Sequence, residues 1–208
     1  MSYRNRTDAG HVLAAAVSRA VDVDVHCVLG IPRGGVIVAL PVAEALGAAL
    51  DVAVARKIGA PNQRELAIGA VTADGPAFFN SALIDRLSVT DEYLDAEVAA
   101  ARVEARRREQ LYRRELPPPA FADHTVVVVD DGVATGATLI AVLRMVVAAA
   151  GQVVVAVPVG PRDTLEALRR EAAHVVCPLV PRWFAAVGEW YDDFRQTTDE
   201  EVLTALGG

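Results

Sequence analysis

The sequence predicts an α/β protein built on a doubly wound, mainly parallel sheet. Four β-branched residues, Val126–Val129, form a continuous apolar run, which is typical of a strand buried on both faces of a parallel sheet. Short apolar runs alternate along the chain with longer segments of helical periodicity, and this alternation is typical of consecutive β-α-β units. The chain has 208 residues, of which 53% are hydrophobic, so one large domain with a full core is expected.

In the first half of the chain, a helix is expected to begin near Thr7 or Asp8, because either residue can cap it and an apolar stripe follows. A second helix, 36–46, ends before Gly47, and Pro41 must lie in its first turn or kink it. Strands are expected at 25–31, 51–55 and 67–72, with a short strand at 77–79.

The second half of the chain opens with a long helix at 91–115, which carries an inward apolar stripe and ends before the prolines at 117–119. The strand at 126–129 leads into a helix at 139–150, and a strand at 153–157, a helix at 163–172 and a strand at 174–177 continue the alternation. The tail, 181–208, is expected to be irregular and then helical from about Asp199.

The charge of the chain argues against general nucleic-acid binding. Its net charge is −7, which would repel a phosphate backbone. The arginine-rich stretch at 102–114 is interpreted as a solvated helix face, because Glu104 and Arg108, and likewise Glu109 and Arg113, are spaced as i,i+4 pairs.

The cysteines and the hydropathy favour a cytoplasmic protein. Cys27 and Cys177 both lie in apolar runs, so two buried thiols are expected rather than a disulfide or a metal site. No apolar run reaches the roughly 18 residues that a membrane-spanning helix needs, and the N-terminus has no apolar signal core.

The most specific motif is the stretch Val126–Thr138, which runs from the buried strand through Asp130 and Asp131 into a loop of small residues and then a helix. At such a junction the free N–H groups and the positive end of the helix dipole can hold a phosphate. The carboxylates can accept hydrogen bonds from sugar hydroxyls, and two adjacent carboxylates are electrostatically costly unless a ligand uses them. The P-loop pattern does not fit, because only three residues separate Gly132 from Gly136 and no lysine follows.

This stretch resembles the phosphoribosyl pyrophosphate (PRPP) signature of the type I phosphoribosyltransferases, an apolar strand and two acidic residues followed by a loop that ends Thr-Gly-x-Thr. The resemblance covers nearly the whole chain. It implies an α/β core at 1–180, with a helical insertion at about 91–115, and a small C-terminal hood at 181–208. It also implies that the first strand lies beside strand 126–129, at a topological switch point where ligands bind.

The resemblance implies magnesium-dependent transfer of a 5-phosphoribosyl group from PRPP to a nitrogen acceptor, a nucleobase or a related heterocycle, with release of pyrophosphate. The implied partners are therefore PRPP and a small acceptor, with no nucleic acid and no membrane, and a homodimer is left open. Mg²⁺ is expected to be held mainly by PRPP and water.

The resemblance also assigns roles to residues. Binding of the 5′-phosphate falls on Ala134, Thr135, Gly136, Ala137 and Thr138. Pyrophosphate binding falls on Arg33, Gly34 and Gly35, in a loop that often contains a non-proline cis peptide in this family. The catalytic residues are expected to be Asp130, Asp131, Lys57 and Arg33, and the base is expected to contact Phe184, Val187 and Trp190 of the hood.

Two further features bear on the reaction. The polar segment Arg56–Glu65 is expected to be a mobile loop that closes over the site, so that Lys57 can neutralise the departing pyrophosphate. In the 6-oxopurine transferases a third aspartate of the loop can act as a base toward the purine, but here that place is Ala134. The sequence therefore argues against hypoxanthine and guanine as acceptors.

Two other classes of function stay open at this point. One is a non-catalytic sensor that binds PRPP or a nucleotide on the same fold and regulates a partner, since fold alone does not decide function. The other is a doubly wound flavin- or nucleotide-binding protein, although the chain contains no G-x-G-x-x-G motif to support it.

Overall fold

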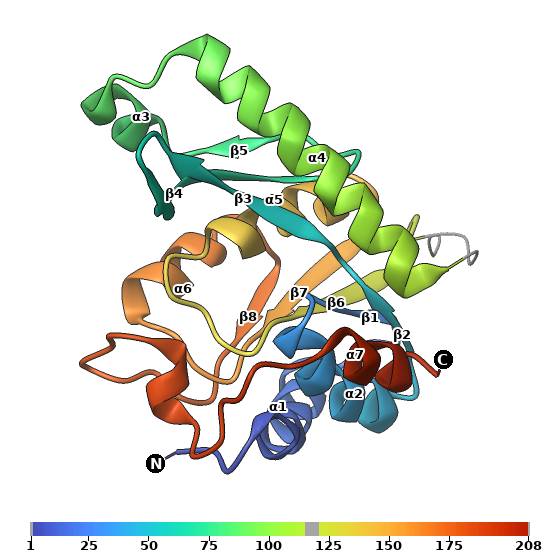
Figure 1. Cartoon of the computed structure of the whole chain (residues 1–208). Helices are drawn as coiled ribbons and strands as arrows, with labels where there is room; N and C mark the ends of the chain where they lie inside the picture. Colours follow the sequence, from blue (N-terminus) through green and yellow to red (C-terminus); the bar gives the residue numbers. More distant parts are fainter. Residues whose placement is uncertain (1, 115–120, 208) are drawn as a thin grey trace.

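The computed structural model describes residues 2–114 and 121–207, with the exception of the Glu65 side chain. Figure 1 shows a body around one parallel sheet and a smaller lobe above it. The helices are α1 Arg6–Ala20, α2 Gly34–Leu46, α3 Ser81–Leu87, α4 Asp91–Arg113, α5 Ala137–Val147, α6 Arg162–Leu168 and α7 Asp199–Ala205. The strands are β1 Val25–Gly30, β2 Ala49–Val52, β3 Ala55–Ala60, β4 Gln63–Thr72, β5 Phe78–Phe79, β6 Thr125–Val129, β7 Gln152–Ala156 and β8 His174–Val176.

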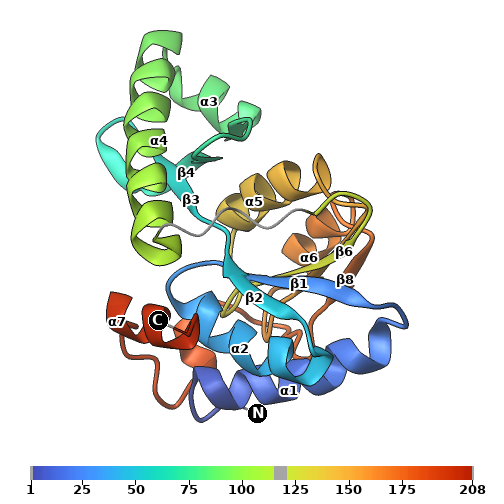
Figure 2. The same cartoon turned by 90° about the vertical axis from the view of Figure 1, so that its right-hand side faces the viewer.

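The central sheet has the order β2-β1-β6-β7-β8, and all of its pairings are parallel. This confirms the predicted fold class and the predicted position of the first strand beside β6. The apolar run of β6 is fully buried because its side chains alternate between two cores. Val126 and Val128 pack toward α5 and α6, whereas Val127 and Val129 pack toward α1 and α2. Figure 2 shows these two helix pairs on opposite faces of the sheet.

Residues 55–79 differ from the prediction, because they form a second, antiparallel sheet of order β3-β4-β5. The expected mobile loop Arg56–Glu65 is mostly a β-hairpin, which turns at Pro61 and Asn62, where Asn62 has a φ of 60°. Strand β3 was not predicted, because its segment is rich in polar residues. In the structure its polar side chains face outward, while Ile58 and Ala60 pack into a small core with α3 and α4. The short helix α3 was not predicted.

Helix α4 ties this upper lobe to the body. One stripe of α4 packs on the antiparallel sheet, and its C-terminal end contacts β2. Arg113 Nε lies 3.1 Å from Asp51 Oδ2, and Arg113 Nη2 donates to the Val52 carbonyl at 2.9 Å. The expected pairs of Glu104 with Arg108 and of Glu109 with Arg113 are both present. The expected helix end at residue 115 and the prolines at 117–119 lie outside the described residues.

The N-terminal segment pairs with the hood segment around Tyr191. Tyr3 forms a parallel bridge with Tyr191, and its backbone N–H donates to the Trp190 carbonyl at 2.8 Å. Helix α7 begins at Asp199, as predicted, and a capping box formed by Thr198 and Glu201 stabilises its start. Both cysteines are free thiols. Within the described residues, no helix has the length and apolarity needed to cross a membrane.

The buried face of α5 should carry much of the stability of the body. Leu143 is fully buried between α5 and the sheet, so Leu143→Ala should lower the free energy of unfolding by about 2–5 kcal/mol, because it removes apolar contacts and leaves a cavity. Urea denaturation followed by circular dichroism measures this loss. Val103→Ala on α4, where the side chain is 69% exposed, is the control and should change stability by less than about 0.5 kcal/mol. Equal losses in both variants would contradict this assignment of the core.

Candidate active site

Asp130 and Asp131, the acidic pair, lie at the carboxyl end of β6, directly beside the end of β1. From these two neighbouring strands the connections run in opposite directions, through α2 to β2 and through α5 to β7. This divergence is a topological switch point, where the helices leave a crevice at the edge of the sheet. Asp130 and Asp131 are half-buried in this crevice.

Negative charge at the acidic pair is electrostatically unfavourable in the free protein. Burial raises the pKa of Asp130 well above its usual value, and the adjacent Asp131 carboxylate raises it further. The Asp131 backbone N–H, 2.9 Å from Asp130 Oδ1, and the nearby Lys57 charge oppose this rise. Burial also raises the pKa of Asp131, and the guanidinium of Arg6 is the main group that opposes it.

The loop after the acidic pair has the geometry of an anion site. It ends at Gly136, whose φ of 78° lies in the left-handed region that favours glycine, and α5 begins at the next residue. No side chain caps α5, so its first N–H groups face the loop without a capping partner. From α6, Thr164 Oγ1 donates to the Ala134 carbonyl at 2.6 Å and holds the loop in place.

The two glycines after Arg33 have different surroundings. Gly34 borders the cavity, whereas Gly35 packs against the end of β6, where a Cβ would lie 2.8 Å from the Val129 carbonyl oxygen. Gly35 therefore allows α2 to approach the sheet closely. The peptide bond between Pro32 and Arg33 is cis, as the resemblance implied. Arg33 also borders the cavity, and its Nη1 lies 3.8 Å from Asp199 Oδ1 of α7.

The hood contributes a different set of side chains from the set that the sequence suggested. Val187 borders the cavity and touches the acidic loop, because a Cβ on Gly132 would lie 2.5 Å from Val187 Cγ1. Phe194, which was not predicted, also borders it. Phe184 and Trp190 are not among the lining residues. The short 3-10 helix Val187–Trp190 directs Trp190 instead toward the cluster around Tyr3 and Tyr191.

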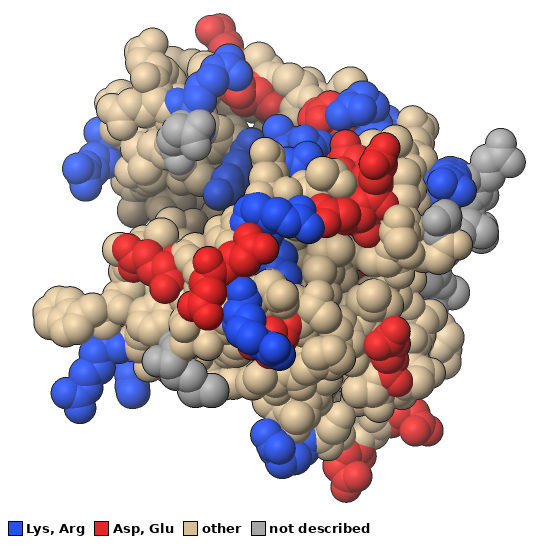
Figure 3. All heavy atoms as spheres, turned by 60° about the horizontal axis from the view of Figure 1, so that its bottom comes forward, with Lys and Arg blue, Asp and Glu red and all other residues tan. Residues whose placement is uncertain are grey.

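These parts enclose one open cavity of about 410 Å³. Its walls include both aspartates, the loop 134–138, Arg33, Gly34 and, from the upper lobe, the exposed Lys57. Figure 3 shows a charged face of the molecule, on which Lys and Arg side chains intermingle with Asp and Glu side chains around a hollow. The structure thus brings together, from three distant parts of the sequence, two carboxylates, two cationic side chains and an uncapped helix N-terminus.

Besides Phe194, two further residues at the site were missed in the sequence. Arg6 Nε lies 2.8 Å from Asp131 Oδ2, although the residues are 125 positions apart. The Tyr191 hydroxyl donates to the backbone carbonyl of Asp131. A single arginine near the start of a helix and one tyrosine in an irregular tail carry no local pattern, so no sequence signal could have linked them to the acidic pair.

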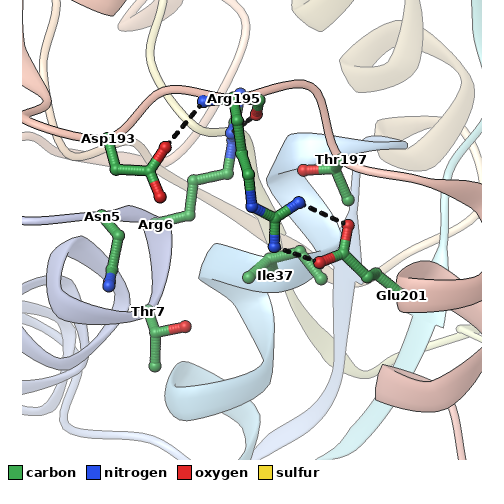
Figure 4. A pocket seen from close by; sticks show the side chains of 8 residues that line it. All are labelled: Asn5, Arg6, Thr7, Ile37, Asp193, Arg195, Thr197 and Glu201. Carbon is green, nitrogen blue, oxygen red and sulfur yellow. Dashed lines mark hydrogen bonds and ion pairs between the residues drawn. The ribbon is translucent and has the colours of Figure 1, made fainter.

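Arg6 also borders a second, smaller hollow of about 160 Å³, whose walls include Ile37 of α2 and Asp193 and Arg195 of the hood segment. Figure 4 shows Arg6 between α1 and the segment that carries Asp193 and Arg195. Its Nη1 donates to the Arg195 carbonyl at 2.7 Å, and its guanidinium carbon lies 4.0 Å from the centre of the Phe194 ring. The Arg6 side chain therefore lines the second hollow and contacts Asp131 and Phe194, which line the first.

The comparisons with known proteins agree with this geometry. The family model described as "Phosphoribosyl transferase domain" matches residues 6–194. The chain belongs to the phosphoribosyl transferase family. A Mycobacterium tuberculosis protein named "Putative phosphoribosyl transferase Rv0571c" is 40% identical over 205 residues. That alignment covers 98% of this chain but 46% of the relative, so the chain spans about half the length of the curated relatives it matches.

Two solved structures resemble this phosphoribosyl transferase domain to different degrees. TT1426 from Thermus thermophilus is 43% identical, with a TM-score of 0.83 over 99% of this chain and 98% of that one. A Neisseria gonorrhoeae protein, crystallised with ppGpp, is 13% identical, with a TM-score of 0.51 over 100% of this chain and 97% of that one. The second likeness shows a shared fold alone.

The raised pKa of Asp130 predicts that its negative charge lowers the stability of the ligand-free protein. An aspartate whose pKa is higher in the folded protein than in the unfolded chain lowers stability as the pH rises from its unfolded pKa through its folded one. Asp130→Asn should therefore raise the melting temperature of the ligand-free phosphoribosyl transferase domain at neutral pH, by about 2–4 °C for each kcal/mol gained. The gain should shrink at acidic pH, where Asp130 is itself protonated.

Asp131→Asn is the matched comparison. It should raise the melting temperature less than Asp130→Asn does, because burial also raises the pKa of Asp131 but the Arg6 guanidinium opposes that rise and loses its charged partner in the variant. Differential scanning calorimetry of both variants over a range of pH measures the two effects. Equal shifts of the melting temperature in the two variants would contradict the different environments of the two carboxylates.

Proposed function

We propose that the protein transfers the 5-phosphoribosyl group from the magnesium complex of PRPP to a nitrogen acceptor and releases pyrophosphate. The observation that carries this proposal is the single cavity in which the acidic pair lies between an uncapped helix N-terminus and the Arg33–Gly34 loop. A polyanionic sugar phosphate needs these features together, namely two anion sites with hydrogen-bond acceptors between them.

Each part of the cavity has a role in this proposal. The 5′-phosphate accepts hydrogen bonds from the first N–H groups of α5 and from the hydroxyls of Thr135 and Thr138. The ribose hydroxyls donate to Asp130 and Asp131. The diphosphate lies at Arg33 and Gly34, where it can draw the Arg33 guanidinium away from its long contact with Asp199.

The chemical step follows from these positions. The C1–O bond breaks, its electron pair leaves with pyrophosphate, and the positive charge that develops on the sugar is stabilised by the two nearby carboxylates. Lys57 and Arg33 neutralise the leaving group. A ring nitrogen then donates its lone pair to C1 from the opposite side, and its proton passes to solvent or to the released pyrophosphate. Positioning and electrostatics supply the rate acceleration.

Magnesium fits this proposal as part of the substrate. Among the described residues no group of three or more His, Cys, Asp or Glu side chains is arranged to hold a metal ion. The diphosphate and ribose oxygens of PRPP, together with water, are the hard oxygen ligands that Mg²⁺ prefers. When bound, the ion would neutralise the diphosphate and so make it a better leaving group.

The acceptor is proposed to lie against the hood, with Val187 and Phe194 as its apolar contacts. A flat heterocycle can stack on the Phe194 ring, whose other neighbour is the Arg6 guanidinium. This assignment replaces Phe184 and Trp190 as base contacts, because neither lines the cavity. The hairpin that carries Lys57 is proposed to close over the bound substrate.

The proposal predicts pyrophosphate release from PRPP in the presence of a suitable acceptor. A panel of purines, pyrimidines and other nitrogen heterocycles, assayed with Mg²⁺, should contain at least one that supports turnover. The double variant Asp130→Asn, Asp131→Asn should lower that turnover by about 100-fold or more, because the carboxylates act on charge that develops in the transition state. The control is Asp22→Asn with Asp24→Asn, an exposed pair before β1 at the opposite edge of the sheet, which should keep full activity.

The outcomes of this assay separate the candidate functions. Tight binding of PRPP in calorimetry without turnover of any acceptor would favour the sensor. No binding of PRPP would refute the proposal altogether.

Hypoxanthine and guanine should be poor acceptors within this panel. The loop carries Ala134 at the place where a base toward the purine would stand, and a general base must lie within hydrogen-bond reach of the proton it removes. Initial rates of nucleotide formation, followed by chromatography, test this. Ala134→Asp should raise the rate with hypoxanthine, whereas Ala134→Asn, which has the same size but is no base, should not. Hypoxanthine turnover by the unmodified protein that matches its best acceptor would contradict the prediction.

A further inference from the structure

The Asp131 carboxylate is held by one cationic side chain. Arg6 Nε donates to Asp131 Oδ2 at 2.8 Å, and the two side chains are only 11% and 17% exposed. A charge-assisted hydrogen bond of this kind, partly removed from water, fixes both the ionisation and the orientation of the carboxylate. Oδ1 is not held by Arg6, and Asp131 borders the cavity proposed to bind PRPP.

This pair lies directly on the Arg33–Gly34 loop. A Cβ placed on Gly34 would come within 2.0 Å of Asp131 Oδ2 and 2.5 Å of Arg6 Nε. No side chain fits between the loop and the pair. Gly34 is therefore needed for the contact of Arg6 with Asp131, in addition to any close approach of an anion.

The same guanidinium also holds the hood. Arg6 Nη1 donates to the Arg195 carbonyl at 2.7 Å, and the guanidinium lies 4.0 Å from the centre of the Phe194 ring, which borders the acceptor side of the cavity. Figure 4 shows the side chain reaching from α1 to this segment. One residue of α1 thus contacts the acidic loop and the hood together.

We propose that Arg6 is a positioning residue for ribose binding: it keeps Asp131 charged and aimed at the sugar hydroxyls, and it links that carboxylate to the hood segment Phe194–Arg195. This inference rests on the proposed function, because it assigns a ribose-binding role to Asp131. It goes beyond that function in naming a residue outside both anion loops on which substrate affinity depends.

The groups around Asp131 determine how its ionisation depends on Arg6. Arg6 reaches it from α1, Asp130 precedes it in the same loop, Lys57 from β3 acts on Asp130, and the Tyr191 hydroxyl from the hood donates to its carbonyl. Burial raises the pKa of Asp131, and Arg6 is the main influence that limits this rise. Without Arg6 the carboxylate takes up a proton at higher pH, and the protonated form is a poorer acceptor for a sugar hydroxyl.

The test is the affinity for Mg²⁺–PRPP, measured by isothermal titration calorimetry from about pH 5 to about pH 8. Arg6→Met should weaken binding roughly 10- to 100-fold near neutral pH, and the loss should grow as the pH falls. Arg6→Lys keeps the positive charge but loses the planar guanidinium. Compared with Arg6→Met, it should therefore bring the pH dependence of binding much closer to that of the unmodified protein and recover part of the affinity. Arg4→Met is the matched control, because Arg4 makes a surface ion pair with Asp8 in the same segment. Any pH dependence that this control shares with Arg6→Met comes from protonation of PRPP itself.

A second measurement reads the carboxylate without any ligand. In protein labelled with ¹³C at the aspartate carboxyl carbon, with Asp131→Asn to assign the signal, Arg6→Met should move the titration of Asp131 to higher pH. A loss of affinity that is equal at every pH and is not relieved by Arg6→Lys, or an unmoved titration of Asp131, would overturn the inference. If the unmodified protein fails to bind PRPP while the titration moves as expected, the proposed function fails and the control of Asp131 by Arg6 stands.

Discussion

Two carboxylates at the end of a fully buried strand are the constraint on which the rest of this site depends. Burial and mutual repulsion raise the pKa of Asp130, so the free protein maintains these charges at an energetic cost. Each carboxylate has a cation that reduces the cost, Lys57 for Asp130 and Arg6 for Asp131. A cavity that is expensive to keep charged is one that gains from a ligand with complementary hydroxyls and developing positive charge.

The parallel sheet explains why the carboxylates lie beside both the Arg33–Gly34 loop and the loop 134–138. The order β2-β1-β6-β7-β8 places the ends of β1 and β6 side by side, and each strand is followed by a helix that begins at the same edge. Loops that are about a hundred positions apart in the sequence therefore become neighbours. The glycines at 34, 35 and 136 let the backbone of these loops come close to the strand ends or take a left-handed turn.

The remaining walls come from elements that carry little pattern. The β3–β4 hairpin brings Lys57 to the cavity from the upper lobe, and the hood brings Val187 and Phe194. Helix α4 links the lobe to the body through Arg113 and Asp51, while its Tyr112 hydroxyl donates to Asp199 of α7 at 2.6 Å. Because Asp199 also lies near Arg33, the lobe, the tail and the Arg33–Gly34 loop share a chain of polar contacts.

The sequence by itself determined the elements whose signals are local. The valines of β6, the acidic pair and the loop at 134–138 are contiguous, so hydrophobic burial and turn chemistry predicted both the strand and the anion site. Only the tertiary structure decided which distant side chains complete the site. Phe194 and the hairpin around Lys57 reach the cavity, and Arg6 reaches Asp131 in its wall, through packing between segments far apart in the chain. That packing leaves no period or spacing in the residues themselves.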